Sequence, residues 1–313
     1  MNELLLRRRN KATEKGYFHF ADPEVERIVV SHIGDDTGVT LQQIQACTSI
    51  GTWFKDNANI VTFDEFKEFT GVKSLQTGAF NNCTSLVSII TPPLTSITYG
   101  NDRIFGYDYA LNNVVLDCNF VNQAISKSGD GNGLLHIKGN LGTTASYSWA
   151  TNYIIYKKVI VDGNLTINHG SNVQRCMFGN YSSISEIIIK GDYTNGVSGN
   201  IFYSQPSGNK PEFIEIGGVV NGYLTNVTTT NSISRVLASD CIIHLGYNGV
   251  AGSVSYIIPS SVVYDRLSKL YVGDGSSAVN DQAVLNQYLA DSGWAAYSSK
   301  LDLWSNYNGE YKN

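Results

Sequence analysis

Pairs of apolar residues separated by a single residue recur through the middle of the chain. In a strand, both residues of such a pair point to one face and the residue between them points to the other. The successive spacings of the pairs are 21, 24, 28, 27, 29 and 27 residues. This pattern predicts one short strand per coil, with coils stacked in parallel about 4.8 Å apart around a continuous core. Seven pairs align: Val114/Leu116, Leu135/Ile137, Val159/Val161, Ile187/Ile189, Ile214/Ile216, Ile243/Leu245 and Leu270/Val272.

A longer internal repeat supports this interpretation. The stretch GAFNNCTSLVSII at residues 78–90 recurs about 98 residues later as CMFGNYSSISEII at residues 176–188, with Phe80 aligned on Phe178. In both copies the apolar residues follow L-x-x-I-x-T/I, the strand-and-turn signature of a leucine-rich repeat. We therefore expect a mainly β protein, a leucine-rich-repeat parallel β-solenoid with small helical caps at its N- and C-terminal ends.

The first copy also resembles a known family. Its AF-x-x-C-x-x-L pattern and following strand are similar to BspA-type leucine-rich repeats, common in surface proteins of gut Bacteroidota and in proteins of their phages. The resemblance is specific at residues 60–91, weaker at residues 92–275, and returns at residues 292–300 in a segment similar to the family's closing SGW..Y..K. The resemblance implies an adhesive surface protein. The residues that carry it are Phe80, Cys83, Leu86 and Ile89.

Four segments are predicted along the chain. Residues 1–16 form an N-terminal anchor or tail, residues 17–56 a helical N-terminal cap, residues 57–275 the solenoid and residues 276–313 a C-terminal cap. Caps are expected because the end repeats of a stack must differ from the internal ones.

The N-terminal cap is predicted to hold two helices. Asp22 followed by Pro23 indicates the start of the first helix, and Thr40 is expected to cap the second. Residues 34–38 lie where relatives often carry an acidic loop that resembles a calcium site. Only two adjacent acids remain there, whereas calcium ligands occupy alternate positions, so we expect no metal. The side chains expected to point inward are Val25, Ile28, Val29 and Ile33, then Leu41, Ile44 and Cys47.

The C-terminal cap is predicted to begin with a helix at residues 279–289. Residues 305–313 are polar and are predicted to form a mobile tail. The residues expected to cover the last coil are Trp294, Tyr297, Leu301, Leu303 and Trp304.

The amino-acid composition of the chain limits the kinds of molecule that it is expected to bind. Charged residues make up 16% of the chain, against about 25% in average proteins, so the surface must be rich in neutral hydrogen-bonding groups. Such a surface is typical of proteins that bind sugars or stack on neighbours. The formal net charge of −5 gives no general attraction to nucleic acid or anionic membrane. No apolar run reaches the roughly 18 residues of a membrane span.

The five cysteines are far apart and form no C-x-x-C motif, so we expect buried thiols rather than a zinc or redox site. Cys83 and Cys118 fall at positions that face a coil interior. No cofactor is expected.

The first nine residues, MNELLLRRR, place apolar residues before charged ones, the reverse of a secretory signal. We therefore expect no such signal. The segment is interpreted either as a frayed tail or as an anchor on a partner protein, because leucines and arginines together suit an apolar contact with a charged rim. The anchor residues are Leu4, Leu5, Leu6, Arg7, Arg8 and Arg9.

Two surface columns follow from the stacking. After each apolar pair, the first four coils carry Asp117, Lys138, Asp162 and Lys190, whose alternating signs predict a structural ladder of exposed ion pairs. Each such pair contributes about 0–1 kcal/mol, so the ladder favours correct register more than stability. The outward side chains are partly apolar, so we expect either a cover or packing on another copy. They are Val115, His136, Ile160, Ile188, Glu215, His244 and Tyr271.

The loops between strands are rich in tyrosine and tryptophan, which suit recognition surfaces because they offer rigid contact area with a polar tip. The alternative interpretation is that many of these aromatic side chains fill the ends of irregular coils. The candidate binding residues are Tyr147, Trp149, Tyr153, Tyr181, Tyr193, His136 and His244.

No motif for nucleophilic, metal-dependent or phosphate chemistry is present in the sequence. Glycoside cleavage would need two carboxyl groups about 5–9.5 Å apart. Asp162 and Glu215 lie two coils apart, roughly 10 Å by stacking. Lysines beside Asp162 are expected to keep it ionised and paired. We therefore predict that the chain is not an enzyme.

The leading hypothesis is a non-catalytic structural and recognition protein. Such a protein would be a virion-attached fibre, appendage or decoration subunit of a phage of gut bacteria. It would bind host-surface glycan or neighbouring subunits, as a homo-oligomer or part of a larger assembly, without nucleic acid or a membrane span. One alternative is an adhesin on the bacterial cell surface. The other is a polysaccharide-cleaving solenoid enzyme.

Overall fold

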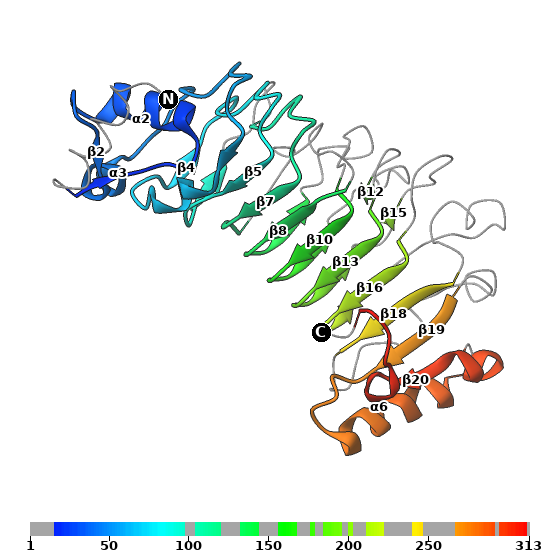
Figure 1. Ribbon diagram of the computed structural model, residues 1–313. Helices are drawn as coiled ribbons and strands as arrows, with labels where there is room; N and C mark the ends of the chain where they lie inside the picture. The colour runs from blue at the N-terminus through cyan, green and yellow to red at the C-terminus, as the bar shows by residue number, and fades with distance from the viewer. Residues whose placement is uncertain are drawn as a thin grey trace. The chain divides into compact units, whose positions relative to one another are not determined.

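The chain forms two compact units, residues 1–130 and residues 131–313, each a stack of coils joined by parallel strands (Figure 1). The predicted mainly β fold, a parallel β-solenoid with helices at its ends, is confirmed. No helix in the described part of the chain is long and apolar enough to cross a membrane. The computed structural model describes residues 16–97, 104–119, 132–143, 156–167, 176–178, 184–195, 200–202, 211–221, 240–246, 267–291 and 294–311.

The first unit begins with the predicted helical cap. Helix α2 starts after Asp22, and the capping box of α3 joins the side chain and backbone of Thr40 to those of Gln43. Val25, Ile28, Val29 and Ile44 are buried as expected, whereas Leu41 is 39% exposed, because it is the first residue of α3 and faces solvent. The elements of the cap are β1 (Tyr17–Phe18), α2 (Pro23–Ile33), β2 (Val39–Thr40), which pairs antiparallel with β1, and α3 (Leu41–Ala46).

Three parallel strands define the coils of the first unit, and Ser88 of the middle one pairs with Thr62 and Asn113. Phe54, Phe80 and Phe105 occupy equivalent places on the three coils and stack face to face, with ring centroids 5.4 and 5.5 Å apart. All three rings are fully buried, so this column lies in the core of the first unit. The strands and the short helix between them are β3 (Thr62–Phe63), a 3-10 helix (Asp64–Glu68), β5 (Ser88–Ile90) and β7 (Asn113–Leu116), beside the pair β4 (Ser74–Leu75) and β6 (Ser96–Ile97).

Cys83 and Asp108 hold the same place on successive coils, and both side chains are fully buried. The backbone N–H of Cys83 donates to Oδ1 of Asp108 over 2.7 Å. Burial raises the pKa of the Asp108 carboxyl to about 8, although hydrogen bonds from backbone N–H groups oppose the shift. The Asp108 carboxyl is therefore mostly neutral at pH 7 inside the folded unit.

In the second unit the strands stack in chain order: β8 with β10, β13, β16, β18 and β19. Six of the aligned apolar pairs lie here as consecutive rungs in the predicted register, and their side chains are at most 4% exposed. The remaining pair, Val114 and Leu116, is buried in β7 of the first unit. The strands are β8 (Leu134–Ile137), β10 (Lys158–Val161), β13 (Glu186–Ile189), β16 (Phe213–Ile216), β18 (Cys241–Leu245) and β19 (Leu267–Val272).

After these strands the chain turns a corner, where side-chain oxygens of successive coils accept backbone N–H groups of the next coil in a polar ladder. The side-chain oxygen of Asn140 accepts the backbone N–H of Asn164 at 2.7 Å, Asn164 accepts that of Asp192 at 2.8 Å, and Asp192 accepts that of Val219 at 2.8 Å. The residue before each acceptor or donor is glycine; a Cβ on Gly191 would lie 2.3 Å from Oδ1 of Asn164. A second parallel sheet follows this corner: β9 (Leu141–Thr143), β11 (Leu165–Ile167), β14 (Tyr193–Asn195) and β17 (Val220–Asn221), with the further pair β12 (Cys176–Phe178) and β15 (Asn200–Phe202).

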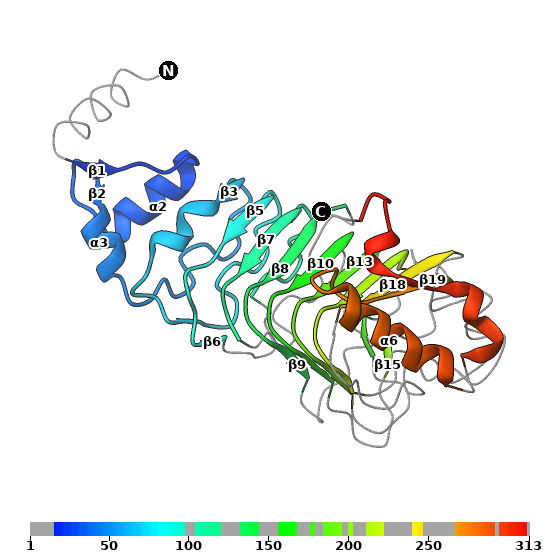
Figure 2. The ribbon, with the colours of Figure 1, turned by 90° about the horizontal axis from the view of Figure 1, so that it is seen from below.

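The C-terminal part of the second unit closes the stack. Helix α6 (Ala278–Ala290) matches the predicted helix and lies beside β19 (Figure 2). It also lies beside β20 (Leu301–Leu303), which pairs in parallel with β19 (Figure 1). Tyr288 and Trp294 are 2% and 1% exposed and pack edge to face. Two 3-10 helices, Ala295–Lys300 and Trp304–Asn306, flank β20.

The buried Asp108 carboxyl predicts a pH dependence. Its pKa in the folded chain, about 8, exceeds the value of about 3.8 in the unfolded chain, so unfolding releases a proton between these values. The free energy of unfolding should therefore fall as pH rises from about 4 to about 8, by up to about 1.4 kcal/mol per pH unit from this group. Urea unfolding measured across this range checks the slope. Asp108→Asn should flatten it and the exposed Asp36→Asn should not; an unchanged slope in Asp108→Asn would contradict the assignment.

Candidate functional site

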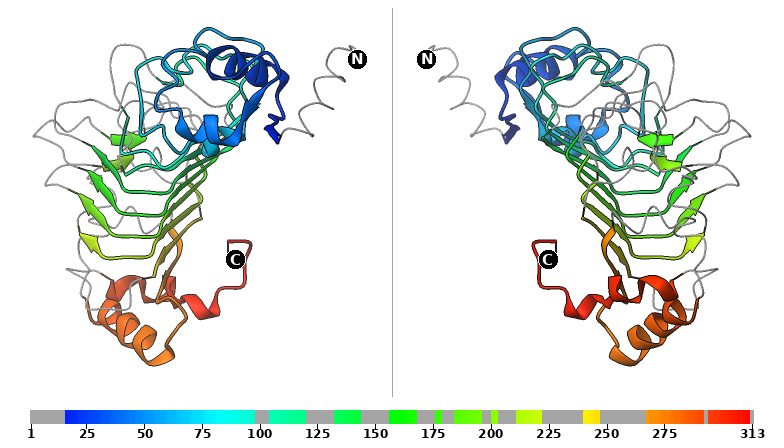
Figure 3. Two further views of the ribbon diagram at one scale, coloured as in Figure 1. Left: turned by 90° about the vertical axis from the view of Figure 1, so that its left-hand side faces the viewer. Right: turned by 90° about the vertical axis from the view of Figure 1, so that its right-hand side faces the viewer.

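The outward face of the second unit's sheet carries several of the predicted site residues. His136, Ile160, Ile188, Glu215 and Tyr271 are partly exposed on it, whereas His244 is only 5% exposed. The chain after β20 runs back over this face, on the outer side of the strands (Figure 3). The cover expected for this partly apolar face is thus supplied in part by the chain itself.

Aromatic side chains hold this C-terminal cover, residues 304–311, on the sheet. The rings of Trp304 and His244 stack with centroids 3.8 Å apart, and those of Tyr311 and Phe213 with centroids 4.4 Å apart. Tyr307 is 7% exposed and stacks on Trp304. The prediction of a mobile polar tail is therefore wrong up to Tyr311, because Tyr307 is buried and Tyr311 stacks on Phe213 of the sheet. Trp304, expected to cover the last coil, packs on the outward face instead.

His244 is fixed beneath this cover. Its Nε2 lies 2.9 Å from the carbonyl oxygen of Gly273, and its Nδ1 lies 3.3 Å from Oε2 of Glu215. With one face stacked on Trp304, the ring has no access to a ligand. The prediction of His244 as a surface binding residue is therefore wrong in this structure, because the covering segment occupies that surface.

Asp162 shows what the predicted ion-pair ladder does. Its carboxylate lies 2.7 Å from Nζ of Lys190, as predicted, and 2.9 Å from Nε2 of His136 on the preceding coil. Burial opposes ionisation of Asp162, but the hydrogen bonds from Lys190 and His136 outweigh it and lower its pKa. Asp162 is therefore an ionised, paired carboxylate, and His136 joins the ladder from the outward column. The contribution of Asp117 and Lys138 stays a prediction.

A pocket of about 250 Å³ lies where the C-terminal cover meets coils β10, β13 and β16. Its walls carry both signs of charge, and Lys158 forms a 2.8 Å ion pair with Glu186. Burial, followed by the nearby Glu310, Glu212 and Glu186 carboxylates, raises the pKa of the Tyr311 phenol. The phenol therefore stays protonated and able to donate a hydrogen bond. The pocket thus offers hydrogen-bonding groups and charges of both signs, with two lysines and three glutamates in its lining.

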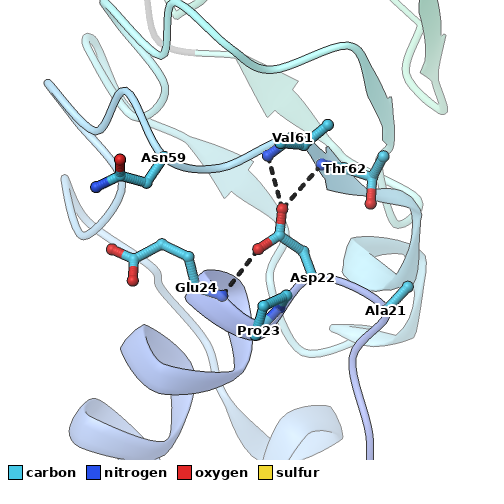
Figure 4. Close-up of a pocket in the computed structure, with 7 residues that line it drawn as sticks. All are labelled: Ala21, Asp22, Pro23, Glu24, Asn59, Val61 and Thr62. Carbon is cyan, nitrogen blue, oxygen red and sulfur yellow. Dashed lines mark hydrogen bonds between the residues drawn. The ribbon is translucent and has the colours of Figure 1, made fainter. Parts of the chain in front are cut away.

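A second, open pocket of about 570 Å³ lies at the N-terminal edge of the first unit (Figure 4). Oδ2 of Asp22 accepts the backbone N–H groups of Val61 and Thr62 at 2.6 and 3.1 Å, while Oδ1 accepts that of Glu24 at 2.8 Å. The Arg27 guanidinium, then the Asn57 amide, lower the pKa of Glu24 to about 2. Both carboxylates of this pocket are therefore engaged in structural contacts.

The contacts of Asp22 copy those between coils. On the next coils, the carbonyl oxygen of Val87 accepts the N–H groups of Asn112 and Asn113 at 2.8 and 3.0 Å. Val61 and Thr62 are the equivalent donors at β3, which is the end strand of its sheet within the described residues. Oδ2 of Asp22 thus takes the place of the missing carbonyl.

Of the remaining predicted site residues, Tyr193 is described by the structure and the others are not. Tyr193 is fully buried in β14, where it pairs in register with the buried Leu165, so its assignment to a recognition surface is wrong and it fills the coil interior. Within the described ranges, no cluster of His, Cys, Asp or Glu could hold a metal ion. The anchor Leu4 to Arg9 and the aromatic residues Tyr147, Trp149, Tyr153 and Tyr181 lie outside the described residues.

Asp22 gives a prediction for the first coil. Asp22→Ala removes a helix cap and a charged acceptor for two strand N–H groups, so the free energy of unfolding should fall by about 2–4 kcal/mol. Asp22→Asn, which retains one acceptor oxygen, should lose less. Urea unfolding measures both, with the exposed Asp36→Ala as a control that stays within about 0.5 kcal/mol of wild type. A loss no larger than that of the control would show that Asp22 does not complete the coil.

Trp304 gives a prediction for the covered face. Trp304→Ala removes the ring that stacks on His244 and should lower the free energy of unfolding by about 2–4 kcal/mol. It should also increase binding of a hydrophobic dye, because the outward face of β16 and β18 becomes accessible. Leu289→Ala, at a side chain that is 40% exposed on α6, is the control and should change neither measurement. Unchanged dye binding in Trp304→Ala would mean that the cover does not depend on this ring.

Comparison with protein-family models, curated proteins and solved structures finds no match for this chain. The resemblance to BspA-type repeats therefore remains a prediction, most specific at residues 60–91 and found again at residues 292–300. The solenoid fold is established by its own strand pairing.

Proposed function

We propose that this chain is a non-catalytic structural and recognition protein, carried on the surface of a virion of a phage that infects gut bacteria. The observation that best supports a non-catalytic role is the state of Asp162 and Glu215, the two carboxylates that a polysaccharide-cleaving site could have used. Asp162 is held by Lys190 and His136, and Glu215 lies against His244. A general acid for glycoside cleavage needs a raised pKa, whereas that of Asp162 is lowered.

The architecture supports a recognition role. A stack of coils in register is rigid and repeats the same surface positions at a fixed spacing, which suits contact with an extended or repetitive partner. The resemblance of residues 60–91 to BspA-type repeats supports surface adhesion, and the occurrence of that family in phages of gut bacteria supports the virion. In this proposal residues 1–16 attach the chain to the particle.

The attachment can be tested on purified particles. Virions that lack this protein are mixed with wild-type chain, with the chain lacking residues 1–15, and with two matched variants, Leu4, Leu5 and Leu6 to Ser and Arg7, Arg8 and Arg9 to Gln. Co-sedimentation should be lost with the deletion and with the serine variant, because the apolar contact supplies the affinity. The glutamine variant should bind more weakly and with less dependence on salt. Co-sedimentation of the truncated chain at the wild-type level would show that the anchor lies elsewhere.

A further inference from the structure

One backbone position recurs on the three coils of the first unit with a left-handed conformation. Asp56, Asn82 and Tyr107 have φ angles of 59°, 63° and 69°. They hold equivalent places, two residues after the stacked Phe54, Phe80 and Phe105. Aspartate and asparagine tolerate this conformation, whereas a bulky tyrosine in it is an outlier that costs of the order of 1–3 kcal/mol. The third coil therefore places a tyrosine where the first two coils have residues suited to the turn.

The turn that carries Tyr107 is firmly held. The backbone N–H of Asn82 donates to the carbonyl oxygen of Gly106 at 2.8 Å, which ties the turn to the preceding coil. The next side chain, Asp108, is fully buried and accepts the N–H of Cys83. The buried Asp108 between Tyr107 and Tyr109 leaves both tyrosine rings on the outer side of the coil.

Tyr107 and Tyr109 are 44% and 51% exposed, and they are the exposed rings among the Phe, Tyr and Trp side chains whose burial the structure describes. Their rings pack edge to face, with centroids 6.4 Å apart and an angle of 77° between the planes. This contact orders the two rings before any ligand arrives. It also presents a ring face next to a second ring.

Polar groups continue the same column on the neighbouring coils. Nδ2 of Asn82 donates to Oδ1 of Asp56 at 3.1 Å, and this exposed pair lies on the coils that precede Tyr107. Aromatic rings have an electron-rich face that attracts polarised C–H groups. A sugar residue offers such C–H groups on one face and hydroxyl groups at its rim, which matches rings beside an amide and a carboxylate. An apolar peptide would cover this exposed amide–carboxylate pair without adding a hydrogen bond to it.

We propose that Tyr107 and Tyr109, flanked by Asn82 and Asp56, form a surface subsite for a sugar residue of a polysaccharide. The inference deepens the proposed recognition role and rests on it. The tyrosine rings supply the stacking platform, and the Asn82 amide and Asp56 carboxylate bind hydroxyl groups of the same or the adjoining sugar. The backbone strain at Tyr107 is then the cost of placing a ring where the turn itself favours asparagine.

The test uses the full chain on a printed array of bacterial capsular and O-antigen polysaccharides. Wild type should bind a subset of them, and Tyr107→Asn should weaken that binding by about tenfold or more, equivalent to about 1.4 kcal/mol. Because Asn82 adopts the same backbone on the preceding coil, Tyr107→Asn should melt at or above the wild-type temperature. Tyr109→Ser should also weaken binding, whereas Val279→Asn, at an apolar side chain that is 80% exposed on α6, should not.

The outcomes separate the subsite from the wider proposal. If wild type and Tyr107→Asn bind the arrayed polysaccharides equally well, the subsite is wrong, but the proposal that the protein binds glycan still stands. A wild-type chain that binds no polysaccharide on the array would also overturn it. A lower melting temperature in Tyr107→Asn would show that the ring serves the fold. Co-sedimentation with virions, which depends on residues 1–15, should be the same for Tyr107→Asn and wild type, so loss of attachment and loss of sugar binding are distinguishable.

Discussion

Every coil in this protein depends on its neighbour for its backbone hydrogen bonds. A buried N–H or C=O without a partner costs free energy comparable to a lost hydrogen bond, so a coil cannot end in isolation. Within the stack the adjacent strand meets this need, as when the carbonyl oxygen of Val87 accepts two N–H groups from the next coil. At the last coil β20 adds a further parallel strand to β19. The first coil uses a side chain, Asp22, for the same purpose.

The same constraint explains which parts of the structure could be predicted from the sequence. Alternating apolar pairs at a near-constant spacing allow one burial pattern, and the observed register from Leu135 to Leu270 follows it. The helix starts at Asp22 and Thr40 were also predictable, because capping depends on residues three or fewer positions away. Local and periodic signals were therefore sufficient for the coils and the caps.

Contacts between distant parts of the sequence were not predictable in this way. The second role of Asp22 joins residues 39 and 40 positions apart, and the cover over His244 depends on aromatic side chains set in a polar stretch. Tyr193 was misassigned because tyrosine is typical of recognition surfaces. Its pairing in register with Leu165 places its side chain in the coil interior. The polar ladder of Asn140, Asn164 and Asp192 did leave a signal in the sequence. Glycine followed by Asn or Asp recurs at Gly139, Gly163 and Gly191, with the same spacing as the strands.

The carboxylate of Asp22 has a consequence beyond the coil it completes. The free edge of a parallel sheet is a template on which strands of other molecules can pair, and this is a common route to aggregation. At β3 that edge is occupied by a group that accepts hydrogen bonds and carries charge, so a foreign strand would have to displace it before pairing with Val61 and Thr62. Pairing of a second copy at this edge would therefore cost the two hydrogen bonds that Asp22 accepts.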